Sequence, residues 1–132
     1  MRTITRLSVI ALTGAATLLP MTAASAKGVD SVTRSGACSV GSTWTMRAAE
    51  AAGDTAAIRL TVNSATAGQT WSVQMARQGT QFFSGRRTTN AAGDFTINTS
   101  AREVKNVDDV YTARARNLRT GEVCSAQVVL PG

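Results

Sequence analysis

Two cysteines, Cys38 and Cys124, are the only thiols in the 132-residue chain, and their role limits which folds are open to it. Counting by twos from each cysteine reaches mainly apolar residues, namely Val40, Trp44, Met46 and Ala48 after Cys38, and Ala126, Val128 and Leu130 after Cys124. Alternate side chains of an extended strand lie on one face. If both segments are strands, both cysteines point into a common core.

The rest of the sequence favours a disulfide between these two cysteines. A catalytic thiolate needs a general base, and the chain contains no histidine, which argues against Cys-His and Ser-His pairs alike. Two cysteines without histidine supply half of a structural zinc site. We therefore predict a Cys38–Cys124 disulfide, which closes a loop of 86 residues and ties the last strand to the start of the domain.

The start of the chain predicts export, which makes a disulfide chemically accessible. Residues 1–26 combine two arginines, an apolar run and the small residues Ala24-Ser25-Ala26, the pattern of a signal peptide cleaved after Ala26. The apolar run is interrupted by Gly14 and Pro20 and is too short for a membrane anchor. The mature form is expected to have no membrane span, 106 residues and, with two arginines removed, a net charge of +4 rather than +6.

Apolar and polar residues alternate along the mature sequence, as they do in antiparallel strands with one buried face. Residues 27–37 are polar and lack a period, so they are expected to be a flexible lead-in to a single domain over residues 38–132. Within that domain, short runs such as AIRLTV and TWSVQM place apolar residues at every second position, and turn formers separate them. Residues 46–53 could instead be a short helix, because MRAAEAAG consists of helix formers ending on glycine. We expect strand and turn there, since AAGD recurs at 91–94 before the strand-like FTIN.

The predicted fold class is all-β. We expect an immunoglobulin- or fibronectin-like antiparallel β-sandwich of about seven strands with one disulfide, in which residues 119–122 turn the chain between the last two strands.

Four segments carry a resemblance to a known group of proteins. CSVGSTW at 38–44, GQTWSVQM at 68–75, NAAGDFTI at 90–97 and ARNLRTGEVC at 115–124 resemble small secreted immunoglobulin-like β-sandwich proteins of high-GC Gram-positive (actinobacterial) bacteria, a group without an assigned activity. The resemblance implies the sandwich fold and the Cys38–Cys124 bond. It transfers no catalytic residue.

The sequence offers little catalytic chemistry. It has no phosphate loop, dinucleotide fingerprint, nucleophile elbow or metal-binding helix motif. The one adjacent acid pair, Asp108-Asp109, is expected in a turn as solvated charge rather than as a calcium or catalytic site. We therefore expect a protein that is not an enzyme and that has no cofactor, catalytic residue or metal site.

Two groups of residues are candidates for binding. The first is QFFSGRR at 81–87: only one of the adjacent rings Phe82 and Phe83 is expected to enter the core, which leaves an exposed ring beside Arg86 and Arg87. The second is Arg114 and Arg116, which face solvent together with Thr112 if Ala113 and Ala115 face the core. Arg59 points outward by the same rule. A solvated sheet face without a ligand is the alternative for each group.

These observations predict a secreted, non-enzymatic binding module. Its partner is unknown; an anionic cell-wall polymer, a glycan or an extracellular protein fits the positive charge, and no specific nucleic-acid binding is expected. The alternative function is a small secreted inhibitor of an extracellular hydrolase, because a rigid cross-linked sandwich can present a preorganised loop.

Overall fold

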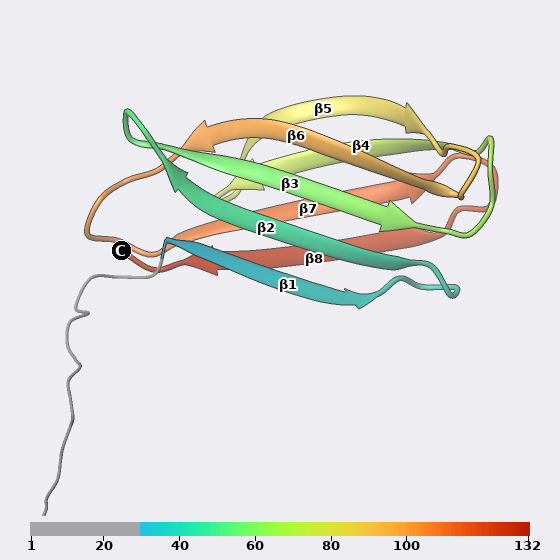
Figure 1. Cartoon of the computed structure of the whole chain (residues 1–132), viewed down its shortest axis with the longest axis horizontal. Coiled ribbons are helices and arrows are strands. Elements are labelled where there is room, and N and C mark those ends of the chain that lie inside the picture. The colour runs from blue at the N-terminus through green and yellow to red at the C-terminus, as the bar shows by residue number, and fades with distance from the viewer. Residues whose placement is uncertain (1–29) are drawn as a thin grey trace, which may run out of the picture.

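Residues 30–132, described by a computed structural model, form two four-stranded antiparallel sheets packed face to face (Figure 1). Sheet A has the strand order β1-β2-β3-β6 and sheet B the order β5-β4-β7-β8. The strands are β1 Ser31–Ala37, β2 Thr43–Ala51, β3 Thr55–Asn63, β4 Thr70–Arg77, β5 Thr80–Thr88, β6 Asp94–Arg102, β7 Asp109–Asn117 and β8 Val123–Leu130. The predicted signal peptide, residues 1–26, lies outside the described residues, and no helix in the described part is long and apolar enough to cross a membrane.

The predicted alternation of apolar residues is confirmed. The alternate apolar side chains lie between the two sheets and form the core. In β3 the exposed Arg59 lies between the buried Ile58 and Leu60, and in β4 Trp71 and Val73 are fully buried. The largest buried side chains come from both sheets and are Trp71, Tyr111, Met46, Ile58, Leu60, Met75, Ile97 and Leu130. At about 25 cal/mol per Å² of apolar surface, burying one such side chain contributes roughly 1.5–3 kcal/mol.

Residues 46–51 belong to strand β2 and not to a helix. β2 pairs with β3 from Thr43↔Asn63 to Ala51↔Thr55, and Met46 and Ala48 are fully buried. Gly53 and Asp54 turn the chain with positive φ angles of 76° and 55°. Pairing with β3 and burial of one face therefore override the helix propensity of the alanines.

The expectation that residues 27–37 are a flexible lead-in was wrong for residues 31–37, which form β1 and bring the number of strands in residues 30–132 to eight. β1 is an edge strand paired with β2, and Val32 packs against the core. The strand period is hidden because Arg34 and Gly36 share the inward register with Val32. Gly36 is needed there: a Cβ atom would lie 2.8 Å from the Trp44 indole.

The predicted disulfide is confirmed, and it joins the edge strands of the two sheets. Cys38 follows β1 and Cys124 lies in β8, so the bond links sheet A to sheet B. The alternating pattern counted from Cys38 belongs to a strand only from Thr43 onward. Residues 38–42 are a loop, in which Cys38 is half-buried and Val40 is 74% exposed.

The buried carboxylate of Glu122 holds this loop in place. It accepts hydrogen bonds from the backbone amides of Val40 and Ser42 at 2.9 and 2.8 Å, and from the Ser42 hydroxyl at 2.6 Å. Burial by itself raises the pKa of the Glu122 carboxyl, but the bonds from Ser42 and Val40 outweigh it and hold the pKa below its usual value.

Loss of the disulfide should destabilise the domain strongly. Replacement by Cys38→Ser/Cys124→Ala should lower the free energy of unfolding by up to about 4–4.7 kcal/mol, because the bond removes the entropy of a long loop in the unfolded chain. Urea denaturation measures the difference. Alkylation of the unreduced wild type should add no mass, and any added alkyl group would contradict a closed bond.

Removal of the Glu122 charge should weaken the attachment of the loop at residues 38–42 to the segment that carries Glu122. At pH 7, Glu122→Gln should cost about 1–3 kcal/mol of unfolding free energy, because buried donors lose a charged acceptor. The pKa is lower in the folded state, so the carboxylate stabilises fully above its unfolded pKa of about 4.3 and progressively less as pH falls through the folded pKa. The gap between variant and wild type in denaturant titrations should therefore narrow at pH 3. The exposed Glu50→Gln serves as the control, and a gap that stays constant with pH would contradict this account.

Candidate functional site

The outer face of sheet B is the surface on which predicted binding residues meet. Strand pairing places Ser72 of β4 directly between Arg86 of β5 and Arg116 of β7. The next outward row contains Gln74 of β4 beside Arg114 of β7. We call this surface the arginine–glutamine face, and its long side chains are Arg86, Arg114, Arg116, Gln74, Gln81 and Gln127.

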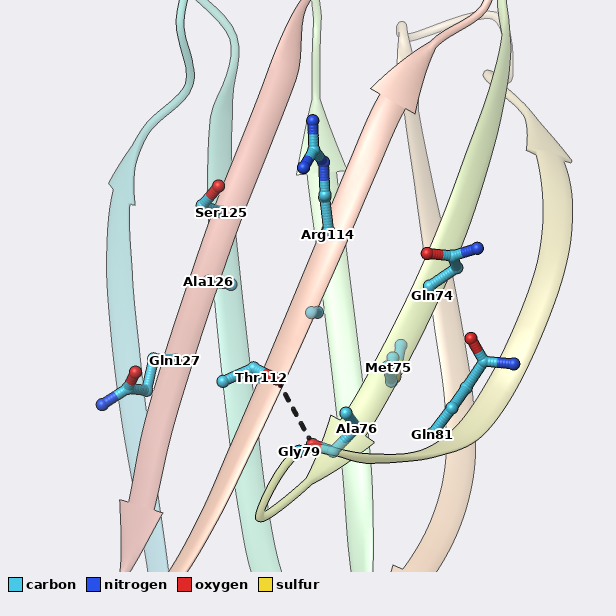
Figure 2. A pocket seen from close by; sticks show the side chains of 11 residues that line it. Gln74, Met75, Ala76, Gly79, Gln81, Thr112, Arg114, Ser125, Ala126 and Gln127 are labelled. Carbon is cyan, nitrogen blue, oxygen red and sulfur yellow. Dashed lines mark hydrogen bonds between the residues drawn. The ribbon is translucent and has the colours of Figure 1, made fainter.

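A shallow groove of about 450 Å³ crosses this face (Figure 2). Its shape follows from one row of paired residues, Gln81, Ala76, Thr112 and Gln127. The short side chains of Ala76 and Thr112 lie in the middle of the row, and the two glutamines flank them on opposite sides (Figure 2). Arg114 and Ser125 line the groove farther along the sheet.

The face is positively charged and contains no acid. Arg86, Arg114 and Arg116 are exposed, and within residues 30–132 none of them takes part in a salt bridge. The outward positions of β4, β5, β7 and β8 hold no aspartate or glutamate. Guanidinium and amide groups therefore offer hydrogen-bond donors without a counter-charge from the same surface.

This donor set suits oxyanions better than metals. Guanidinium forks bind carboxylate, sulfate and phosphate groups in a bidentate manner, and glutamine amides and hydroxyls add neutral hydrogen bonds. Among the described residues, no group of three or more histidine, cysteine, aspartate or glutamate side chains could hold a metal ion. The face can therefore bind an anion at its surface.

The structure brings together three of the six predicted binding residues and separates the others. Arg86, Arg114 and Arg116 share the arginine–glutamine face, and Arg114 and Arg116 point outward as expected. Arg87 lies on the inner side of the edge strand β5, opposite the buried Trp71, and its guanidinium covers the Phe83 ring at 5.6 Å.

The expectation that only one of Phe82 and Phe83 enters the core was wrong. The register of β5 shifts between Met75 and Ala76 of β4, and Phe82 has no direct partner there. This bulge lets two consecutive side chains turn inward. Both rings are half-buried against the core, with Phe82 edge-on to Tyr111 at 6.2 Å between ring centroids.

The expectation of solvated charge at Asp108-Asp109 was wrong for Asp109, which is 1% exposed. Its carboxylate pairs with the Arg77 guanidinium, whose Nε donates to Oδ1 at 2.7 Å. Nearby, the Tyr111 hydroxyl donates to the carbonyl oxygen of Arg102 at 2.7 Å. Burial, with a smaller contribution from Asp109, raises the pKa of Tyr111 to about 12, so the phenol remains a donor. These groups hold the connection between β6 and β7 in place.

Sequence reasoning missed Gln74, Gln81 and Gln127. The period of β4 and β8 places Gln74 and Gln127 outward in principle, as it does for Arg114. Their convergence around one groove depends on the order β5-β4-β7-β8, which a single strand pattern does not contain.

Comparisons of the chain with protein-family models, with curated proteins and with solved structures found no match. The functional proposal therefore rests on the chemistry of the arginine–glutamine face.

Both phenylalanines should prove to be structural. Phe82→Ala and Phe83→Ala should each lower the free energy of unfolding by about 1–3 kcal/mol, below the full cost of truncating a core phenylalanine, because each ring is only half-buried. Chemical denaturation measures this, with Val107→Ala, an exposed apolar residue, as the near-neutral control. A phenylalanine variant as stable as that control would mean that the replaced ring does not contribute to the core and is available at the surface.

Proposed function

We propose that the chain is a secreted, non-enzymatic binding module of the immunoglobulin-like class, which binds an anionic cell-wall polymer through the arginine–glutamine face. The observation that carries the proposal is that Arg86, Arg114 and Arg116 project from one regular sheet without any acid on that surface. A bound polymer would supply the missing counter-charge.

Two internal features support the immunoglobulin-like identity. Trp71 is fully buried in β4, where it tilts against Phe95 of the opposite sheet at 6.1 Å between centroids. Tyr111 lies near the start of β7, and its hydroxyl reaches back to the end of β6. Immunoglobulin sandwiches likewise have a buried tryptophan in a central strand and a tyrosine whose hydroxyl reaches back to the backbone, although their tryptophan packs against the inter-sheet disulfide. In this domain Trp71 packs against Phe95, and the disulfide lies at the edge strands.

Secretion is supported by the signal-like residues 1–26 and by the disulfide. Disulfides persist in oxidising compartments and are rare in the cytosol. The same bond closes most of the described domain into a covalent loop, which suits a module that works outside the cell.

The spacing of the arginines favours an extended ligand. Arg114 and Arg116 are two residues apart on one strand, so their Cα atoms are separated by about 7 Å. Arg86 and Arg116 are separated by one intervening strand, a distance of about 10 Å. A chain of repeated charges can contact all three guanidinium groups at once, with one charge to each, whereas a single small anion would have to draw the three side chains together. Each contact is weak, and binding depends on making several at once.

The test is retention on immobilised polyanions. Arg114→Ala/Arg116→Ala should weaken binding of the wild type to purified anionic wall polymer by roughly 3- to 30-fold, because two exposed ionic contacts of a few tenths to about 1 kcal/mol are lost. Retention should fall steeply with salt. The control variant Arg34→Ala/Arg119→Ala removes the same charge from exposed positions outside this face.

The two variants separate a specific face from net charge. If the control loses as much affinity as Arg114→Ala/Arg116→Ala, only overall charge matters and the proposed face is wrong. If the wild type is not retained at low salt, the polymer-binding function itself is wrong.

A further inference from the structure

The outer face of sheet A contains a pair of arginines that repel each other. Arg47 of β2 and Arg59 of β3 are direct cross-strand partners, and both are exposed. Neither takes part in a salt bridge within residues 30–132. Cβ atoms of directly opposed residues lie about 5 Å apart, and like charges at that position destabilise a sheet.

Hydroxyl groups surround this pair. Thr33, Thr45 and Thr61 line a depression of about 370 Å³ together with the two arginines. The Thr45 hydroxyl lies 3.1 Å from that of Ser35, and the Thr61 hydroxyl lies 2.9 Å from that of Thr96. A hydroxyl is one donor and two acceptors, so each of these pairs keeps hydrogen-bonding capacity for a ligand.

In the strands of sheet A, the only acid at an outward position is Asp94, at the end of the sheet. The outward positions of β1, β2 and β3 hold no aspartate or glutamate. Asp94, at the first position of β6, pairs with Asn63 at the end of the sheet and accepts a hydrogen bond from the Asn90 amide at 2.7 Å. Arg47 pairs on its other side with Thr33, and Arg59 with Asn98, so the row is uncharged beyond the two arginines.

The donors match a tetrahedral oxyanion. A carboxylate presents two oxygens in one plane, whereas a phosphodiester group is tetrahedral and presents two charged oxygens and two ester oxygens in different directions. Two guanidinium forks and three hydroxyls around one depression can therefore approach a phosphodiester group from more than one side. We propose that Arg47, Arg59, Thr33, Thr45 and Thr61, the paired-arginine site, bind a phosphate group of a phosphodiester polymer.

This site and the arginine–glutamine face lie on opposite surfaces of the sandwich, because the buried sides of the two sheets face each other (Figure 1). A polymer segment on one surface cannot pass through the core to the other. One copy of the domain therefore binds two separate segments, and it cross-links polymer when the two segments belong to different chains. The bivalent action rests on the proposed function of the arginine–glutamine face.

Bead agglutination tests the inference. Beads coated with poly(glycerol phosphate) should be agglutinated by the wild-type protein, with turbidity rising and then falling as excess protein saturates every segment. Arg47→Ala/Arg59→Ala should still bind single beads within a few-fold of the wild type but lose at least ten-fold in agglutination. Arg34→Ala/Arg119→Ala, the matched charge control, should agglutinate like the wild type. Beads coated with a polycarboxylate should be agglutinated less well, since the paired-arginine site selects phosphate.

A measurement of thermal stability tests the paired-arginine site independently of the arginine–glutamine face. At low salt, Arg47→Ala/Arg59→Ala should remain folded with a melting temperature at or above that of the wild type, because charge repulsion is removed. Soluble poly(glycerol phosphate) should raise the melting temperature of Arg114→Ala/Arg116→Ala, whose paired-arginine site is intact, and should raise it less when Arg47 and Arg59 are also replaced.

The outcomes separate the two proposals. If Arg47→Ala/Arg59→Ala agglutinates beads as well as the wild type, the second site does not exist; a dimer with two arginine–glutamine faces would give this result, and sedimentation would identify it. If the wild type binds beads through Arg114 and Arg116 without agglutinating them, the inference fails while the proposed function stands. If the wild type does not bind the beads but is retained on other anionic wall polymers, the phosphate assignment fails alone.

Discussion

Burial of one side of each strand between two sheets is the constraint on which the structure depends. The core combines large side chains such as Trp44, Trp71 and Met46 with many alanines, including Ala48 and Ala113. Sheets pack about 10 Å apart, so large and small residues must complement each other to fill that layer at the density of a protein interior. Side chains along a strand alternate with a period of two, so the residues next to each inward residue point outward. The alternation that forms the core therefore also determines which residues lie on the two outer surfaces.

The ends of the sandwich are held by specific polar and covalent links. At one end the disulfide and the Glu122 carboxylate tie the loop after β1 to the start of β8. At the other end the Asp109–Arg77 pair and the Tyr111 hydroxyl fasten the connection from β6 to β7. Buried charges are tolerated there because donors satisfy them. With both ends fixed, the sheets between them form a rigid platform for exposed side chains.

The sequence was sufficient for features that follow from strand period alone. The all-β class, two antiparallel sheets, the disulfide and the outward direction of Arg59, Arg114 and Arg116 all follow from alternation, turn formers and cysteine count. Strand β1 was missed because an edge strand can carry Arg34 and Gly36 at inward positions, where a central strand needs apolar residues.

The remaining errors arise where a local device breaks the period or where distant partners meet. The bulge at Phe82 lets Phe82 and Phe83 turn to the same side of β5. No residue in QFFSGRR predicts a bulge at this position. Val40 keeps the phase of the core but lies in a loop, and the buried Asp109 carboxylate is satisfied by Arg77, 32 residues earlier, and by the backbone amide of Val104. Likewise, the meeting of Arg86 with Arg116, and of Arg47 with Arg59, is decided by sheet order and register.

The distribution of charge on the two outer faces is the feature that the proposed binding function would explain. A sheet face that has only to remain soluble gains from mixed charges, since an acid opposite an arginine contributes roughly 0.2–1 kcal/mol. The eight acids of the chain are instead at strand ends and in loops, where Glu122 and Asp109 have structural roles. Gln74 stands beside Arg114 and Asn98 beside Arg59, where a glutamate or aspartate would pair without steric change. Neutral amides at these positions leave the guanidinium groups without a counter-charge beside them, and under the proposed function a bound external anion would supply that counter-charge.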